Sequence, residues 1–210
     1  FIKDMEEVLR NNPEDYDLFA RLVWAEAGGE GFLGQVAVAN VVLNRVASEL
    51  DYMPDSIREV IEQKSTKNGV TTYQFSPMGD GRINQDLTAA EMNIARTAIY
   101  HALTHGDITE GALYFWNPKT SDEKAGNWMQ NNLHILGDIG NHRFATDPKV
   151  AQAISQLKIY EVQLGDTLTS IANKFKVTVE ELVKINNITN PDNIQAGTLI
   201  NIPIGFSSGG

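Results

Sequence analysis

The sequence predicts an α+β protein of two domains, the first mostly helical and the second a small βααβ unit. Apolar residues recur with helical spacing through most of residues 1–105. Between residues 159 and 203 the pattern becomes strand, helix, helix and strand. A chain of 210 residues can hold one ordinary domain and one small one. We therefore divide the chain into a first domain at 1–147, a helical connector at 148–158, a second domain at 159–204 and a tail at 205–210.

Two helices dominate the start of the first domain. Residues 18–26 carry an apolar stripe, and the pair Gly28 and Gly29 should end that helix, which places Glu26 at its end. Residues 32–46 are apolar around most of the helix circumference. This distribution is typical of a helix buried inside a globular domain, so we expect this segment to form the core.

Shorter elements follow the core helix. Residues 56–63 are expected to form a short helix, and residues 88–103 a longer one that starts with a Thr-x-x-Glu capping box at Thr88. Residues 64–86 are polar and punctuated by glycines, which predicts a long loop or a small hairpin. Loops of that length tend to carry function. Residues 111–117 are aromatic and precede a proline, which favours an extended edge strand.

The composition excludes several classes of function. Hydrophobic residues make up 42% of the chain and charged residues 21%, so a fully disordered chain is excluded. The net charge of −10 argues against nucleic acid or an anionic membrane as the main partner. With no cysteine, the chain has no disulfide, thiolate zinc site, iron–sulfur cluster or cysteine nucleophile. No apolar run is long enough for a membrane-spanning helix.

The two ends of the chain say little about its compartment. The N-terminus reads Phe-Ile-Lys-Asp-Met and lacks both an initiator methionine and the layout of a signal peptide. We expect it to be a mature or trimmed end. The final Ser-Ser-Gly-Gly is expected to be a flexible tail.

The second domain resembles a LysM module along its whole length, from residue 160 to residue 203. The resemblance implies a βααβ fold that binds the N-acetylglucosamine of peptidoglycan or chitin between two loops. Glycine and backbone amides suit such a site, because a sugar needs close approach and hydrogen bonds to its acetamide. Residues 165–168 (GDTL) also have the pattern of a turn followed by a helix cap, with Asp166 or Thr167 as the cap. By position, the groove residues are Gly165, Asp166, Thr167 and Leu168 on one side and Asn193, Ile194 and Gln195 on the other.

The first domain resembles the SleB/CwlJ family of spore-cortex-lytic cell wall hydrolases. The resemblance rests on RLVWAEAGGEGFLGQVAVANVVLNR at 21–45, QFS at 74–76, GALYFWNP at 111–118 and GNHRF at 140–144. It implies a mostly helical fold similar to goose-type lysozymes and lytic transglycosylases. It also implies cleavage of the glycan strand of peptidoglycan by a glutamate, and Glu26 is the matching position.

The residues themselves are compatible with that role for Glu26. A glycosidic oxygen is a poor leaving group, and an acid that protonates it contributes about 10²- to 10⁴-fold. Burial at the helix end beside Trp24 would raise the pKa of Glu26 and keep it protonated. A solvated glutamate at a helix end is the alternative interpretation. Glu30 is a possible second carboxylate, which we interpret as a helix-starting or groove residue rather than a catalytic partner.

Other polar and aromatic residues are candidates for the groove wall. They combine aromatic surface with neutral hydrogen-bonding groups, which suits sugar recognition. His142, in the GNHRF match, is expected to be a structural or groove-floor hydrogen bonder. Four polar residues of the core helix are expected to form a network that ties the active-site loop to the helix and could orient Glu26. The wall candidates are Gln74, Phe75, Ser76, Tyr114 and Asn117, and the core-helix set is Gln35, Asn40, Asn44 and Arg45.

Together these features predict an enzyme that cleaves peptidoglycan between N-acetylmuramic acid and N-acetylglucosamine and is held on its polymer by the LysM module. We favour a lytic transglycosylase with one catalytic glutamate, because this chemistry needs no second carboxylate. A hydrolytic muramidase, an amidase, and a binding protein of the wall or spore that has lost activity stay open. We expect no cofactor, no metal site at His101 and His105, no nucleic-acid partner and a monomer. We also expect an extracellular location, in the cell wall or associated with the spore.

Overall fold

The computed structural model describes residues 2–155 and 157–203. Contacts divide the chain into two compact units, residues 1–147 and residues 148–210, which are described separately. The predicted tail at 205–210 lies outside the described residues. Within the described part of the chain, no helix is both long enough and apolar enough to cross a membrane.

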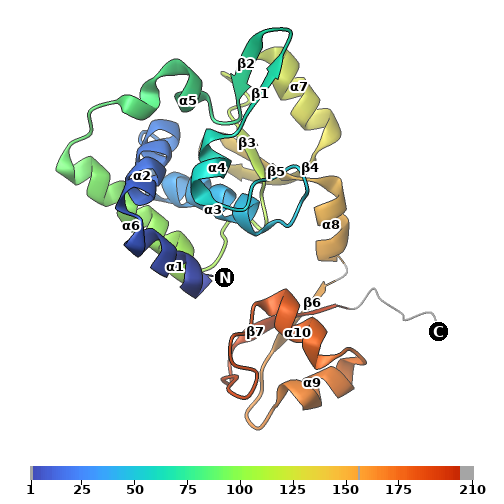
Figure 1. The fold of residues 1–210 in the computed structure, drawn as a ribbon. Coiled ribbons are helices and arrows are strands. Elements are labelled where there is room, and N and C mark those ends of the chain that lie inside the picture. The colour runs from blue at the N-terminus through green and yellow to red at the C-terminus, as the bar shows by residue number, and fades with distance from the viewer. Residues whose placement is uncertain (1, 156, 204–210) are drawn as a thin grey trace. The chain divides into compact units, whose positions relative to one another are not determined.

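Four helices build the core of the first unit (Figure 1). Helix α3 runs through the middle and contacts α2 and α6, and α1 packs on α2 and α6. Most side chains of α3 are buried, as its apolar circumference predicts. Helix α2 starts at Pro13 and ends where Gly28 begins the turn into α3, which confirms that Glu26 sits at a helix end. The four helices are α1 (Ile2–Asn11), α2 (Pro13–Ala27), α3 (Gly31–Ala47) and α6 (Ala89–Thr104).

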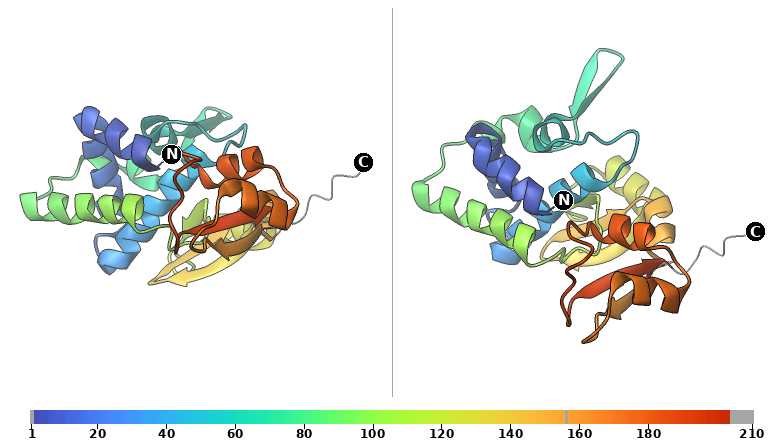
Figure 2. Two further views of the ribbon diagram at one scale, coloured as in Figure 1. Left: turned by 90° about the horizontal axis from the view of Figure 1, so that it is seen from below. Right: turned by 60° about the horizontal axis from the view of Figure 1, so that its bottom comes forward.

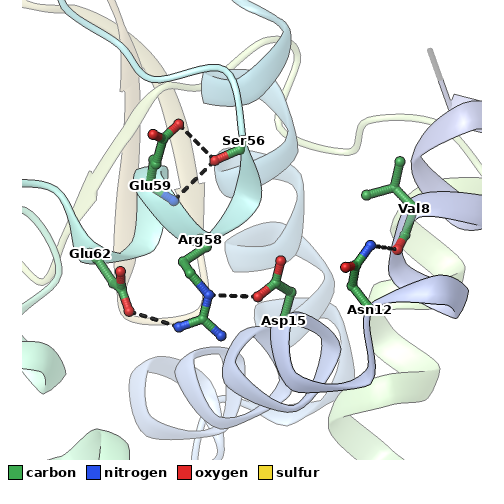
Figure 3. Close-up of polar contacts among 7 residues, drawn as sticks. All are labelled: Val8, Asn12, Asp15, Ser56, Arg58, Glu59 and Glu62. Carbon is green, nitrogen blue, oxygen red and sulfur yellow. Dashed lines mark hydrogen bonds and ion pairs between the residues drawn. The ribbon is translucent and has the colours of Figure 1, made fainter.

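Helices α4 and α6 each begin with a side-chain cap. Helix α4 (Ile57–Glu62) is capped by the Ser56 hydroxyl, which accepts a hydrogen bond from the backbone N–H of Glu59. Figure 3 shows this cap beside Arg58, whose side chain lies 2.6 Å from Asp15 and joins α4 to α2. In α6, the Thr88 capping box is present as predicted.

The segment between α4 and α6 is more structured than a loop. A hairpin comes first, formed by β1 (Lys64–Lys67) and β2 (Val70–Tyr73), and it projects from the unit in Figure 2. Helix α5 (Ser76–Asp80) and a 3-10 turn η1 (Arg82–Asn84) follow. The hairpin is one of the two predicted forms, whereas α5 was not predicted from the sequence.

A three-stranded antiparallel sheet with the order β3-β5-β4 completes the first unit. Strand β3 (Tyr114–Trp116) lies within the predicted aromatic strand, and β5 (His142–Thr146) carries the His-Arg-Phe sequence. Strand β4 (His134–Ile139) and helix α7 (Glu123–Asn132) were not predicted. Phe144 is fully buried against Ala37 and Val41 of α3, so the sheet is fixed on the core helix.

The hydrogen bonds of Asn40, Asn44 and Arg45 do not run to the loop that follows Glu26, so for these three residues the expected link to that loop is wrong. Asn44 donates to Asp107 and to the carbonyl of Ala112, and Arg45 donates to the carbonyl of Leu113. Asn40 likewise accepts a hydrogen bond from the backbone of Ile108. These side chains point from the C-terminal half of α3 toward the strand entry at 107–113, whereas the Glu26 loop lies at the other end of α3. The network therefore positions β3.

The second unit contains the βααβ pattern. After helix α8 (Pro148–Ser155), strands β6 (Leu157–Glu161) and β7 (Leu199–Pro203) pair antiparallel. Helices α9 (Leu168–Phe175) and α10 (Val179–Asn186) lie between them in sequence and each begins with a threonine capping box. The unit has its own core, centred on Ile171, Leu182, Ile200 and Ile202.

Candidate active site

Glu26 lies in the last turn of α2, on the wall of a groove of about 530 Å³. We call this cavity the Glu26 groove. Burial raises the pKa of Glu26 from its ordinary value of 4.5 to about 7. The positive charge of the nearby Arg82 acts in the opposite direction and lowers this pKa, but its effect is smaller. A carboxyl group with this pKa is partly protonated at neutral pH, so it can donate a proton and then accept one.

Arg82 connects the α5–η1 segment to the end of α2. Its guanidinium donates to the carbonyl of Ala25 at 3.1 Å, to the Ser76 hydroxyl at 2.9 Å and to Asp80 at 2.9 Å. These bonds hold the segment next to Glu26. Arg82 was not predicted from the sequence, although the length of the surrounding loop indicated a functional role.

The Glu26 groove contains every groove residue predicted for the first domain. Three different parts of the chain supply them: the α2–α3 turn, the segment after β2, and the strands of the sheet. The predicted residues are Glu26, Glu30, Gln74, Phe75, Ser76, Tyr114, Asn117 and His142. The remaining lining residues, which sequence analysis did not assign to the groove, are Arg45, Tyr73, Arg82, Phe115, Trp116, Thr120, Ser121 and Met129.

Several predicted wall residues also have packing roles. Phe75 is almost fully buried, and the Arg45 guanidinium carbon lies 5.0 Å from the ring centres of both Phe75 and Tyr114. Burial lowers the pKa of Arg45 only to about 10, so it stays charged at neutral pH. The Asn117 side chain accepts from the backbone of Lys119 and shapes the turn after β3. The wall is therefore held in place before any ligand arrives.

Glu30 holds the β4–β5 turn against the start of α3. One carboxylate oxygen accepts from the backbone N–H of Asn141 at 3.0 Å, and the Asn141 amide donates to both oxygens. These bonds lower the pKa of Glu30, and they favour its charged form. Gly140 has φ +60°, and a Cβ there would lie 2.7 Å from the Glu30 carboxylate, so the turn needs glycine at this position.

Glu30→Gln is expected to lower the free energy of unfolding by about 1 kcal/mol, because it loses charge-assisted hydrogen bonds to Asn141. Activity should fall less than about tenfold, since only the turn is disturbed. Chemical denaturation of Glu30→Gln, Asn141→Ala and the double variant measures the coupling between the two side chains. Two results would contradict this structural role: losses of unfolding free energy that add up in the double variant, or a Glu30→Gln variant as inactive as a Glu26 variant.

His142 lies on the groove wall. It is buried, its ring packs edge-on against Phe115 at 5.1 Å, and burial lowers its pKa. His101, on α6, and His105, the C-cap residue of that helix, stack with ring centres 4.1 Å apart and lie outside the lining of the groove. Among the described residues, no group of three or more His, Asp or Glu side chains is arranged to hold a metal ion.

The predicted LysM residues lie on two adjacent loops of the second unit. Hydrogen bonds from Gly197 to Val162 and from Val162 to Thr198 join the loops at their base. Thr167 caps α9, whereas Asp166 instead accepts bonds from the Tyr160 hydroxyl and the Gln163 backbone. The second loop carries Asn193, Ile194 and Gln195, and Ile194 packs against the core of the unit.

Residues of the first of these loops and of the helix start that follows it differ strongly in exposure to solvent. The Leu168 side chain is buried in the core, so only its backbone can face a ligand. Gly165 has φ +90°, which allows the turn that precedes the helix. Leu164, which sequence analysis did not single out, is 95% exposed beside Gly165.

Comparison with known families identifies both units. The profile of the Cell Wall Hydrolase family matches residues 29–145, which is more than half of the chain. The chain belongs to the cell wall hydrolase family. The matched span of this cell wall hydrolase includes Glu30 and starts just after Glu26. The LysM domain profile matches residues 160–203.

Related proteins include spore enzymes and a phage protein. The spore cortex-lytic enzyme of Bacillus cereus is 37% identical over 130 residues, which cover 62% of this chain and 43% of the relative. The spore cortex-lytic enzyme of Bacillus subtilis is 36% identical over 130 residues, which cover 37% of that enzyme. This chain thus spans less than half of those relatives. An endolysin of Bacillus phage B103 is 50% identical over 185 residues, which cover 83% of this chain and 66% of the endolysin.

Among solved structures, the catalytic domain of the germination-specific lytic transglycosylase SleB from Bacillus anthracis is similar. It has 32% sequence identity and a TM-score of 0.49, over 63% of this chain and 93% of that domain.

Proposed function

We propose that this cell wall hydrolase cleaves the glycan strand of peptidoglycan between N-acetylmuramic acid and N-acetylglucosamine, as a lytic transglycosylase. The observation that carries the proposal is Glu26, a carboxyl group with a pKa of about 7 on the wall of a groove rich in polar side chains. Tyr114 and Trp116 add aromatic surface to the same groove. This combination suits a sugar polymer whose bridging oxygen must be protonated.

In the proposed reaction, Glu26 transfers its proton to the bridging oxygen as the bond from that oxygen to the anomeric carbon of N-acetylmuramic acid breaks. The leaving N-acetylglucosamine thereby gains a hydroxyl group. The 6-hydroxyl of the muramic acid then attacks its own anomeric carbon and gives its proton to the Glu26 carboxylate. The products are a 1,6-anhydro ring and a regenerated acid, and no water is consumed.

Glu30 supports the mechanism with a single acid. A two-carboxylate glycosidase needs its second carboxylate free to act as a base or as a nucleophile. Both oxygens of Glu30 accept hydrogen bonds from Asn141, and its pKa is lowered. A carboxylate held in this way is better suited to fixing the β4–β5 turn than to activating a water molecule.

The relatives support a wall or spore polymer as the substrate. Spore cortex-lytic enzymes are 36% to 37% identical to this chain over the 130 matched residues, and a phage endolysin is similar over most of the chain. The LysM unit would hold the enzyme on insoluble glycan and raise the effective concentration of the groove near its substrate. We place the protein in the cell wall or spore. Because one chain supplies both the groove and Glu26, a monomer is sufficient.

Digestion of purified peptidoglycan tests the type of bond that is cleaved. Shorter glycan strands with no new free amino groups are the expected result. New amino groups without shorter strands would instead show an amidase or peptidase. Binding without any cleavage would show a wall-binding protein without activity.

Residues 159–204 expressed alone are expected to fold and to bind peptidoglycan or chitin oligomers, with affinity that rises with chain length. The reason is that this segment contains three of the five β6–β7 residue pairs and its own core. Pull-down with insoluble glycan and titration with chitin oligosaccharides measure the binding. Gly165→Val, which strains a left-handed backbone position, is a variant that should weaken binding. A folded fragment that stays in the supernatant would contradict the binding role.

A further inference from the structure

We propose that a second cavity, beside the Glu26 groove, is an additional subsite for a sugar ring of the same glycan strand, with Trp128 as its stacking platform. We call it the Trp128 chamber. This inference rests on the proposed function, because it assigns to the chamber another part of the same substrate.

The Trp128 chamber lies beside the Glu26 groove. It has a volume of about 380 Å³ and shares four wall residues with the groove: Arg45, Gln74, Tyr114 and Met129. A cavity that shares its wall in this way can be reached by the same extended ligand without a change in the fold. The two cavities are therefore neighbours, and we infer that one glycan strand occupies both.

Trp128 is exposed, and packing in the hydrophobic core does not account for its position on α7. Trp128 is 55% exposed. The structure describes the whole of helix α7, and none of its residues is buried. The indole ring therefore does not anchor α7 in the hydrophobic core. Tyr52, 51% exposed, lines the same chamber, and its hydroxyl donates to Asp147 at 2.6 Å, which fixes the orientation of that ring.

The chemistry of the chamber wall fits a neutral sugar. Pyranose rings have apolar faces that stack on indole and phenol rings and polar edges that need neutral hydrogen-bonding groups. Trp128, Tyr52 and Tyr114 supply the rings, and Gln63 and Gln74 supply the amides. The described lining contains one cation, Arg45, and no carboxylate, so most of its hydrogen-bonding groups are neutral, as a neutral sugar requires.

Indole N–H resonances of the full chain, carrying Glu26→Gln to prevent cleavage, test the subsite directly. All tryptophans lie in the first unit, so glycan bound to the LysM unit does not interfere. Peptide-free peptidoglycan oligomers, from disaccharide to octasaccharide, are the probes. We expect the Trp116 resonance, in the Glu26 groove, to shift with short oligomers and the Trp128 resonance to shift only with longer ones.

Variants then test the energetic role of the indole. Trp128→Ala should weaken octasaccharide binding about 5- to 10-fold and leave disaccharide binding unchanged, as loss of one stacked ring predicts. Trp128→Phe should retain most of the increase in affinity from disaccharide to octasaccharide. Tyr100→Ala removes a similarly exposed aromatic residue outside both cavities and should have no effect on binding.

Three results would overturn the subsite. A Trp116 shift without a Trp128 shift at any length would mean that the strand does not reach the chamber. A Trp128 shift only with oligomers that carry stem peptides would make the chamber a peptide site. If glycan of no length moved Trp116, the proposed function itself would fail, and the subsite with it.

Discussion

Glu26→Gln is expected to lower the rate of glycan cleavage at least about 100-fold, because the amide keeps the shape of the side chain but has no transferable acidic proton. Release of soluble fragments from purified peptidoglycan measures this rate. Binding to the insoluble polymer should be unchanged, because the LysM unit is untouched. The folded state should also persist, since no hydrogen bond of the Glu26 carboxyl group holds the described structure together.

Glu30→Gln is the matched control for this variant, because it makes the same chemical change in the same groove. It should retain more than about a tenth of the activity, as a disturbed turn would allow. If Glu26→Gln kept more than about a tenth of the parent rate, the proton donor would have to be another residue.

The free energy of unfolding should depend on pH through Glu26. Its pKa is about 7 in the folded chain and near 4.5 when exposed, so the folded state holds this proton more tightly. This contribution is therefore fully present below pH 4.5 and is lost as the pH rises toward and through 7. Glu26→Gln removes the titration. At pH 8 it should be more stable than the parent by on the order of 1–3 kcal/mol, and at pH 4 about equally stable.

Chemical denaturation at pH 4, 6 and 8, followed by tryptophan fluorescence, measures this difference. Glu7→Gln is the control, because Glu7 is exposed on α1. Equal differences between Glu26→Gln and the parent at all three pH values would show that Glu26 is not buried as described. The same titration predicts that cleavage falls by about tenfold per pH unit above pH 7, as the acid loses its proton.

Patterns of local sequence were sufficient for the elements that carry the Glu26 groove. The apolar circumference of α3, the two glycines after α2 and the capping box at Thr88 are each encoded within a few residues. The position of Glu26 at a helix end follows from the same signals. The resemblance to known wall hydrolases then indicated which loops meet, because it linked segments that are distant in the sequence.

Contacts between distant segments could not be predicted. Arg82 reaches the carbonyl of Ala25, and Glu30 reaches Asn141, across separations that no periodic pattern records. The same limit explains the error over Asn44 and Arg45, whose polar character was clear but whose partners at 107–113 were not. Helix α7 has only a short apolar stripe, Ala125, Trp128 and Met129, and none of its residues is buried, so neither the helix nor Trp128 was predicted.

The nature of the product tests the mechanism with a single acid most directly. Peptidoglycan digested in water enriched in ¹⁸O can be analysed by mass spectrometry of the new muramic acid ends. If the muramic 6-hydroxyl attacks, these ends will be 1,6-anhydro rings, lighter by one water than reducing ends and free of ¹⁸O. Reducing ends that carry ¹⁸O, together with an inactive Glu30→Gln variant, would show that water is the nucleophile and that a second carboxylate activates it.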